Sequence, residues 1–211
     1  RTLIDGVVVM LAAVAQTLSA YSLVLASGSP RRKELLRQML PAAVDFRVQV
    51  SGFAEDLDKA EFATPVAYVE ETARRKGAAV PCDDNALIIA ADTVVVGVDG
   101  TILEKPSDDA EAVAMITSLS GKTHSVYTGV ALFKRGQSRS FVERTDVTFS
   151  PLDDAVIRAY VATGDPLDKA GAYGAQGAAG AFIERFDGDY FNVVGLPLNR
   201  LSRELLAFLD T

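Results

Sequence analysis

The stretch LVLASGSPRR, residues 23–32, has the pattern of a strand, a tight turn and the start of a helix. Residues 23–26 are uniformly apolar, as in a buried strand, and Ser29 followed by Pro30 is typical of an N-cap and a first helical position. Such a turn points backbone N–H groups and the positive end of the helix dipole at an anion. We therefore predict an anion-binding turn that includes Ser27.

The first turn of this helix also carries two arginines, Arg31 and Arg32. Cations at a helix N-terminus oppose the dipole, and a bound phosphate would remove that local cost. An ordinary capped helix with solvated arginines is the alternative that this segment alone leaves open. The stretch is not a P-loop, because no G-x-x-x-x-G-K-[ST] occurs in the sequence.

Strand and helix patterns alternate along the rest of the chain, and together they predict an α/β fold with a mixed sheet flanked by helices. The 211 residues fit one α/β domain or two lobes that share one sheet. Predicted strands cover about residues 23–26, 87–91, 94–98, 101–103, 125–133, 141–149, 181–186 and 190–194. Predicted helices begin at Pro30, Pro65, Ser107, Asp153 and Pro197, and the glycine-rich stretch 165–180 is a predicted functional loop.

The composition excludes several classes of protein. A formal charge of −7 argues against a general nucleic-acid binder, although a few clustered cations can still hold a small anion. The single cysteine, Cys82, and the single histidine allow neither an intrachain disulfide nor a Cys/His zinc set, which favours a reducing, cytoplasmic location. With 49% apolar and 23% charged residues, no long stretch has a disordered composition.

Residues 6–30 carry no charge, which leaves a membrane helix or signal sequence as an alternative for the N-terminal segment. Polar residues interrupt this stretch, and residues 23–26 are better explained as a strand. About ten strongly apolar residues then remain, a length that suits a packed helix rather than a membrane span. We therefore expect no membrane association.

Three charged residues form a second candidate group. Asp92 follows the apolar strand 87–91, where parallel-sheet proteins place their sites, and burial of its carboxylate requires a metal or a lysine. Lys76 lies on a mostly apolar helix face, and Lys105 follows the predicted hairpin. The alternatives are a strand-end aspartate bonded to backbone N–H groups and lysines whose stems lie along the surface. The apolar face around Lys76 consists of Tyr68, Val69, Thr72 and Ala73.

The remaining candidates lie in loops or at a strand start. Glu55 and Asp56 offer a further carboxylate for a divalent cation, although an acidic surface loop is the commoner meaning of such residues. Gln176 lies between glycines, so its amide can approach the mixed donor and acceptor edge of uracil or thymine; an incidental glutamine in a mobile loop is the alternative. His124 has no serine or cysteine partner at a recognisable site, and we interpret it as structural.

Six motifs, taken in order, resemble the Maf family of nucleotide pyrophosphatases over about residues 23–209. The stretch 57–65 is most similar to eukaryotic members, and the segment before Tyr21 lies outside the pattern. We therefore expect an N-terminal extension over residues 1–20 and a single Maf-like domain over residues 21–211. The motifs are ASGSPRR at 26–32, ADT at 91–93, EKP at 104–106, SGKTH at 120–124, DKAGAYG at 168–174 and NVVGLP at 192–197.

This resemblance implies a mixed α/β fold related to the inosine triphosphatase-like enzymes, with two lobes, a central cleft and a divalent cation. It implies that Asp92 is the proton acceptor and that Arg31, Thr93 and Gln176 are specificity positions. At these three positions the chain is similar to the dTTP/UTP branch. The branch that prefers 7-methyl-GTP has an aromatic residue in place of Arg31 and a glutamine in place of Thr93, and it lacks the loop that carries Gln176. Ala175 departs from the isoleucine of many members, which leaves the breadth of base selectivity open.

The mechanism that follows is hydrolysis of a nucleoside triphosphate to the monophosphate and pyrophosphate. Water activated by Asp92 attacks the α-phosphorus, and Mg²⁺ or Mn²⁺ lies on Glu55 and Asp92. Broader or modified-base selectivity, and a nucleotide-binding regulator of cell division with little turnover, remain as alternatives. A homodimer is left open, and no nucleic acid is expected. The residues expected to hold the triphosphate or balance its charge are Ser27, Arg31, Arg32, Lys76 and Lys105.

Overall fold

The computed structural model describes residues 15–81 and 83–210. Within these residues the strands form a seven-stranded sheet in the order β2-β1-β3-β5-β6-β7, with β4 paired to β3. β1 is parallel to β2 and β3, whereas the β3–β4 and β6–β7 pairs are antiparallel, so the predicted mixed sheet is confirmed. The strands are β1 (Ser22–Ala26), β2 (Arg47–Val48), β3 (Ala86–Val96), β4 (Ile102–Leu103), β5 (Thr123–Lys134), β6 (Gln137–Phe149) and β7 (Ile183–Asp187).

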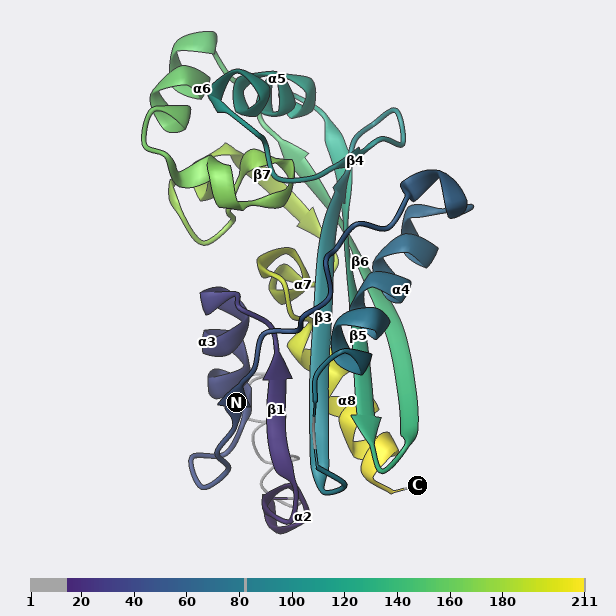
Figure 1. Cartoon of the computed structure of the whole chain (residues 1–211). Helices are drawn as coiled ribbons and strands as arrows, with labels where there is room; N and C mark the ends of the chain where they lie inside the picture. Colours follow the sequence, from purple (N-terminus) through teal and green to yellow (C-terminus); the bar gives the residue numbers. More distant parts are fainter. Residues whose placement is uncertain (1–14, 82, 211) are drawn as a thin grey trace. The chain divides into compact units, whose positions relative to one another are not determined.

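Helices of two kinds connect these strands (Figure 1). The α-helices are α2 (Ala15–Ser19), α3 (Pro30–Met39), α4 (Pro65–Ala78), α5 (Asp109–Leu119), α6 (Asp154–Val161), α7 (Tyr190–Val194) and α8 (Leu198–Leu209). The short 3₁₀ helices are η1 (Lys59–Glu61), η2 (Asp165–Asp168), η3 (Ala170–Ala172) and η4 (Ala178–Phe182).

The chain divides into two compact units. Unit 1 comprises the chain up to Asp92, the segment Thr128–Glu143 and the segment from Gly195 onward; unit 2 comprises Thr93–Tyr127 and Arg144–Val194. Each of β3, β5 and β6 therefore contributes residues to both units. The expectation of a central cleft stays a prediction.

Unit 1 is built around β1 and its parallel neighbours. Ala26 pairs with Ala90 at the carboxyl end of β1, where the chain turns into α3. α4 lies over one face of these strands and α8 over the other (Figure 1). Leu18 of α2 is also fully buried, so the chain just before β1 packs within this unit. The cluster on one face contains Val24, Ala26, Val80, Ala86, Ile88 and Ala90, with Phe133 packed against it.

Unit 2 has an aromatic core. Phe149 of β6 is at its centre, with ring centroids 4.8 Å from Tyr173 and 5.0 Å from His124 in edge-to-face geometry. Helices α5 and α6 pack against each other beside this core. The chain turns after α6 at Gly164, which has a left-handed φ of 75°.

Several local signals in the sequence have the predicted outcome. Ser29, Thr64 and Asp108 are the N-caps of α3, α4 and α5, and each side chain accepts a hydrogen bond from the backbone N–H three residues later. The buried face of α4 contains the predicted residues together with Gly77. The two-residue turn Arg135-Gly136 joins β5 to β6 with positive φ at both positions.

One predicted strand boundary and one predicted strand are wrong. The strand does not end at Asp92, because β3 continues to Val96 by antiparallel pairing with β4 after its parallel pairing with β1 has stopped. Residues 190–194 were predicted as the second strand of a hairpin and instead form helix α7, while β7 pairs with β6. An Asp189 carboxylate oxygen accepts from Phe191 N at 2.8 Å and thereby favours a helical start there.

In the part of the chain that the structure describes, no helix has the length and apolar character needed to cross a membrane. The predicted strand at residues 23–26 is confirmed as β1. The apolar residues upstream that the sequence left open as a packed helix fall mostly outside the described residues, as does Cys82.

Candidate functional site

The turn between β1 and α3 is closed by its two serines. Ser29 Oγ accepts a hydrogen bond from the backbone N–H of Arg32 at 3.4 Å, which caps α3. Ser27 Oγ accepts from Ser29 N at 3.3 Å, and Ser27 is only 7% exposed. The predicted strand–turn–helix is therefore present, with the amides of a capped helix N-terminus beside a buried hydroxyl.

Arg32 is held across this turn rather than extending into solvent. Its Nε donates to the carbonyl oxygen of Gly195 at 2.9 Å, and its Nη1 donates to Ser27 Oγ at 3.2 Å. Burial lowers the pKa of Arg32; the charges of Asp92 and Glu55 act in the opposite direction, and that of Arg31 lowers the pKa further. The guanidinium thus lies within electrostatic reach of both predicted carboxylates.

Lys76 joins those two carboxylates. Its Nζ donates to Asp92 Oδ1 at 2.7 Å and lies 2.6 Å from Glu55 Oε2. Lys76 is 6% exposed and the Asp92 side chain 13%, whereas the Glu55 side chain is 56% exposed. A buried lysine requires a counter-charge, and of the partners that the sequence left open for Asp92, a metal, Lys76 or Lys105, the structure shows Lys76 in contact with it.

Close packing of α4 on the sheet sets the position of Lys76. A Cβ on Gly77 would lie 2.2 Å from Cε2 of Phe133 and 3.1 Å from the Cβ of Ala90, so only glycine lets the helix approach this near. Glu55 reaches Lys76 from the irregular segment between β2 and η1. It has a φ of 56°, which is uncommon for a residue other than glycine and is often found at functional sites.

The other predicted site residues belong to different surroundings. Thr93 follows Asp92 in β3 and is half-buried, whereas Lys105, just after β4, and Gln176, in the turn between η3 and η4, are exposed. These three belong to unit 2, whereas Ser27, Arg31, Arg32, Glu55, Lys76 and Asp92 belong to unit 1. Asp56, beside Glu55, is exposed, and no contact brings it to Lys76 among the described residues.

The loop that carries Gln176 is organised by a lysine that sequence reasoning did not select. Lys169 is 9% exposed, and its Nζ donates to carboxylate oxygens of Asp165 at 2.9 Å and of Asp168 at 2.7 Å. A Cβ on Gly174 would lie 2.7 Å from Cε of Lys169, so the loop backbone lies directly on the lysine stem. The run of small residues around Lys169 was the available signal, because long side chains there would displace that stem.

His124 has the structural environment that the sequence suggested. It is 2% exposed, and its Nε2 shares a 2.8 Å hydrogen bond with the hydroxyl of Tyr173. Burial lowers the pKa of His124 to about 4 and raises the pKa of Tyr173 well above its usual range. Both side chains are therefore neutral near pH 7, and they connect β5 to the glycine-rich loop in the core of unit 2.

Residues 22–208 match a protein family described as Maf-like protein. The chain belongs to the Maf-like family. Among curated relatives, a dTTP/UTP pyrophosphatase of Bacillus cytotoxicus is 48% identical over 186 residues, which cover 88% of this chain and 94% of the relative. A dTTP/UTP pyrophosphatase of Bacillus thuringiensis subsp. konkukian is 46% identical, with 88% and 95% covered. A solved HAM1 protein from Coxiella burnetii is 16% identical, with 89% and 99% covered and a TM-score of 0.47.

The acidic residues of this Maf-like chain suit a cation that also binds its substrate. The carboxylates of Glu55 and Asp92 both contact the ammonium group of Lys76. Within the described residues, no group of three or more His, Cys, Asp or Glu side chains is placed to hold a metal ion. Mg²⁺ is typically bound through one or two carboxylates, with phosphate and water oxygens completing its shell. The two carboxylates fit that pattern, and they do not fit a closed structural metal site.

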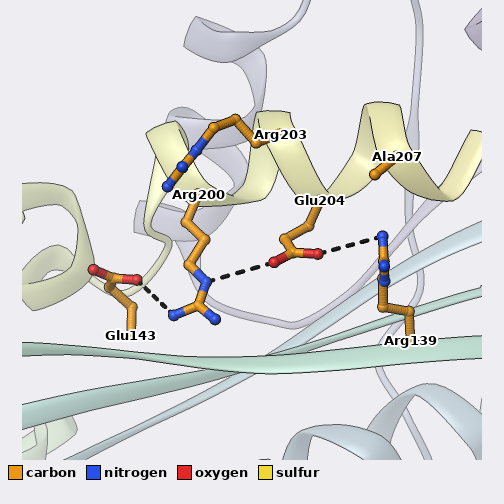
Figure 2. Close-up of a pocket in the computed structure, with 6 residues that line it drawn as sticks. All are labelled: Arg139, Glu143, Arg200, Arg203, Glu204 and Ala207. Atoms are coloured by element: carbon orange, nitrogen blue, oxygen red, sulfur yellow. Dashed lines mark hydrogen bonds and ion pairs between the residues drawn. The ribbon is translucent and has the colours of Figure 1, made fainter.

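A charged hollow of the Maf-like chain contains none of the predicted site residues. It has a volume of about 530 Å³ and lies between β6 and α8 in unit 1 (Figure 2). Arg200 is 3.1 Å from Glu143, and Arg139 is 3.4 Å from Glu204, so oppositely charged groups cross the hollow in pairs. This charge pattern joins α8 to the strand. The hollow is lined by Arg139, Glu143, Arg200, Arg203, Glu204 and Ala207.

Proposed function

We propose that this protein hydrolyses nucleoside triphosphates, with dTTP and UTP as substrates, to the monophosphate and pyrophosphate. The observation that carries the proposal is the buried Lys76–Asp92 pair within electrostatic reach of Arg32, which itself contacts the serine turn. Curated relatives that are 46–48% identical over most of their length are named dTTP/UTP pyrophosphatases. The pairing of an anion-binding turn with a carboxylate base is what such a hydrolysis requires.

The turn and its cations would bind the polyphosphate. The backbone N–H of Arg31 at the start of α3, the Ser27 hydroxyl and the Arg32 guanidinium present donors at one place, and the Arg31 side chain adds a second fork-shaped donor in the same helical turn. The mutual repulsion of Arg31 and Arg32 is relieved when a phosphate binds. Much of the acceleration would come from this positioning and charge stabilisation.

Asp92 would take the proton from the attacking water. Lys76 holds the carboxylate through Oδ1, and within residues 15–81 and 83–210 no hydrogen bond reaches Oδ2. That oxygen can therefore accept a proton while the carboxylate stays oriented by the lysine. Water aligned in this way attacks the α-phosphorus, a P–O bond forms, and the bond to the leaving pyrophosphate breaks.

We further propose that Glu55 and Asp92 hold a divalent cation, Mg²⁺ or Mn²⁺. Such a cation would neutralise charge on the phosphate oxygens and polarise the reacting phosphoryl group. Lys76 lies between the two carboxylates and balances their charge in its absence. Lys105 would balance charge on the phosphates, and Thr93 and Gln176 would contact the base and select it.

A cytoplasmic location is supported by the single cysteine.

Replacement of Asp92 by Asn tests the proposed base. We expect Asp92→Asn to lower pyrophosphate release from UTP by roughly 10²- to 10⁴-fold, because an amide cannot accept the proton. The measurement is pyrophosphate release from a panel of nucleoside triphosphates with Mg²⁺, Mn²⁺ or a chelator. Asp84→Asn, an exposed aspartate just before β3, is the matched control and should keep full activity. Undiminished turnover by Asp92→Asn would show that another group is the base.

Replacement of Gln176 by Ala separates a pyrimidine reader from a broader enzyme. If the amide bonds the base edge, Gln176→Ala should reduce the preference for UTP over purine triphosphates by about tenfold, because a site built around a hydrogen bond discriminates strongly. The kcat/KM ratio of UTP to GTP measures this, with Gln137→Ala at the exposed start of β6 as control. An unchanged ratio favours the broader enzyme.

Nucleotide binding without metal-dependent pyrophosphate release favours a regulator of cell division.

A further inference from the structure

The backbone at Gly195 contacts Arg32 across 163 positions of the chain. The Gly195 carbonyl accepts from Nε of Arg32 at 2.9 Å, while Ser27 Oγ accepts from Nη1 at 3.2 Å. Because a guanidinium is planar and rigid, two acceptors at different nitrogens set both its position and the plane in which it lies. The orientation of Arg32 therefore depends on a peptide far from it in sequence.

The conformation of that peptide requires glycine. Gly195 has a φ of 124°, a backbone region that L side chains rarely adopt. It is buried, and it is followed by Leu196, which is 0% exposed, and by Pro197, whose ring restricts the backbone. The direction of the carbonyl is thus set by the main chain and not by a mobile side chain.

Helix α8 fixes the far side of this segment. Leu201 N donates to the Pro197 carbonyl at 2.8 Å at the start of the helix, and Leu201 and Leu205 are fully buried. The charged hollow adds contacts between α8 and β6 (Figure 2). There Arg200 Nη1 donates to the Val142 carbonyl of β6 at 2.7 Å. The Gly195 carbonyl therefore lies in a buried segment that leads directly into a helix bonded to β6 within unit 1.

We propose that Gly195 is a positioning residue for the hydrolysis: its carbonyl orients Arg32 so that the guanidinium meets the triphosphate. This inference rests on the proposed function, in which Arg32 binds phosphate. Gly195 does not touch substrate, and it acts through Arg32. A misplaced guanidinium loses fork-shaped hydrogen bonding to phosphate oxygens while it keeps its charge.

A double-mutant cycle tests the coupling. Arg32→Ala should lower kcat/KM for UTP by roughly 10- to 100-fold, the effect of losing a charge-assisted hydrogen bond, and Gly195→Ala should lower it by about tenfold. In the double variant, Gly195→Ala should cause no further loss, since the group it positions is absent. Losses that multiply in the double variant would overturn the proposal.

Gly136→Ala is the matched control. Gly136 also has a positive φ, of 77°, in the same unit, and a Cβ there would meet nothing within 4 Å. Gly136→Ala places alanine at a position of positive φ that has no contact with Arg32, and it should leave kcat/KM unchanged. The ratio of UTP to GTP turnover should also stay constant in Gly195→Ala, because a phosphate contact is common to all bases; a changed ratio contradicts the assignment.

Binding of inorganic pyrophosphate separates this inference from the proposed function. Calorimetry should show pyrophosphate binding weakened about tenfold in Gly195→Ala, with no additional loss when Arg32→Ala is also present. If the wild-type protein released no pyrophosphate from any nucleotide, the proposed function would fail. The titration would still measure whether Gly195 affects the binding of pyrophosphate through Arg32. Equal pyrophosphate affinity in wild type and Gly195→Ala would overturn the positioning role.

The wild-type protein offers a check that does not depend on a stable Gly195 variant. The Nε–H of Arg32, identified by its disappearance from the NMR spectrum of Arg32→Lys, should exchange with solvent at least tenfold more slowly than the Nε–H of the exposed Arg203. Exchange as fast as that of Arg203 would show that the carbonyl does not hold the side chain.

Discussion

The buried lysine of α4, Lys76, determines which charged residues must lie beside it. Lys76 lies on an otherwise apolar helix face, and a cation there is stable only beside negative charge. Asp92 and Glu55 provide that charge at 2.7 and 2.6 Å. From the sequence, Asp92 needed a metal or a lysine, with Lys76 and Lys105 as the candidates, and the structure shows Lys76 in contact with it. The Gly195 carbonyl was not predictable, since any residue has a carbonyl and only the fold aims this one at Arg32.

The single histidine gives a prediction about pH. Burial lowers the pKa of His124 to about 4, whereas histidine in an unfolded chain titrates near 6.5. Between these values the unfolded chain binds a proton that the folded protein does not, so stability is full above pH 6.5 and decreases as the pH falls towards 4. The free energy of unfolding should lose about 2 kcal/mol from this residue between pH 7.5 and 5.

Urea unfolding of the wild type and His124→Gln at both pH values measures this contribution. The variant should lose less stability than the wild type on acidification, because glutamine does not titrate. Since the chain contains one histidine, its ring signals in the NMR spectrum report the folded-state pKa without overlap. An equal loss in both proteins, or a ring that titrates near 6.5 while folded, would contradict the assignment.

At the scale of elements, the position of α4 on the sheet sets the geometry of the site. Gly129 of β5 lies against the helix backbone, because a Cβ there would be 2.5 Å from the carbonyl oxygen of Val69. Together with Gly77 it lets the helix lie close enough for Lys76 to reach Asp92. The sequence predicted this helix and its buried face, but nothing local identified Gly129 as a packing position.

Gly129→Ala should therefore affect both stability and activity. We expect a loss of about 1–3 kcal/mol in the free energy of unfolding, since the added methyl group meets helix backbone that cannot rotate away. Turnover at a temperature where the variant is folded should also fall, because α4 and Lys76 shift. Gly52→Ala, where a Cβ meets nothing within 4 Å, is the control and should change neither quantity. If Gly129→Ala kept the stability of the wild type, α4 could move away from β5 at little cost, and the prediction would be wrong.

At the scale of the whole molecule, the two units are interleaved in sequence. The chain passes between them after Asp92, Tyr127, Glu143 and Val194, and the first three of these passages occur within β3, β5 and β6. Neither unit is a continuous piece of chain. Unfolding one unit therefore disrupts strands that also belong to the other, and we expect the protein to unfold in one cooperative transition.

Tryptophan reporters can test that cooperativity, because the chain contains no tryptophan. Tyr21→Trp reports on unit 1 and Tyr190→Trp on unit 2, and both positions are partly exposed. The urea midpoints of the two fluorescence transitions should coincide with each other and with the loss of circular dichroism. Separate midpoints would show that the units unfold independently.

Local patterns in the sequence were sufficient for most elements, because caps, apolar periods and turn residues act over a few neighbouring positions. They indicated the serine turn, the caps of α3 to α5, the face of α4 and Lys76 as one of two lysine candidates to balance Asp92. They did not indicate that β3 continues past Asp92 or that residues 190–194 are helical, because strand pairing and the contacts of Asn192 with Val126 and Thr145 arise between distant segments. Tertiary contacts alone placed Glu55 on Lys76 and the Gly195 carbonyl on Arg32, since only folding brings distant peptides within hydrogen-bond distance.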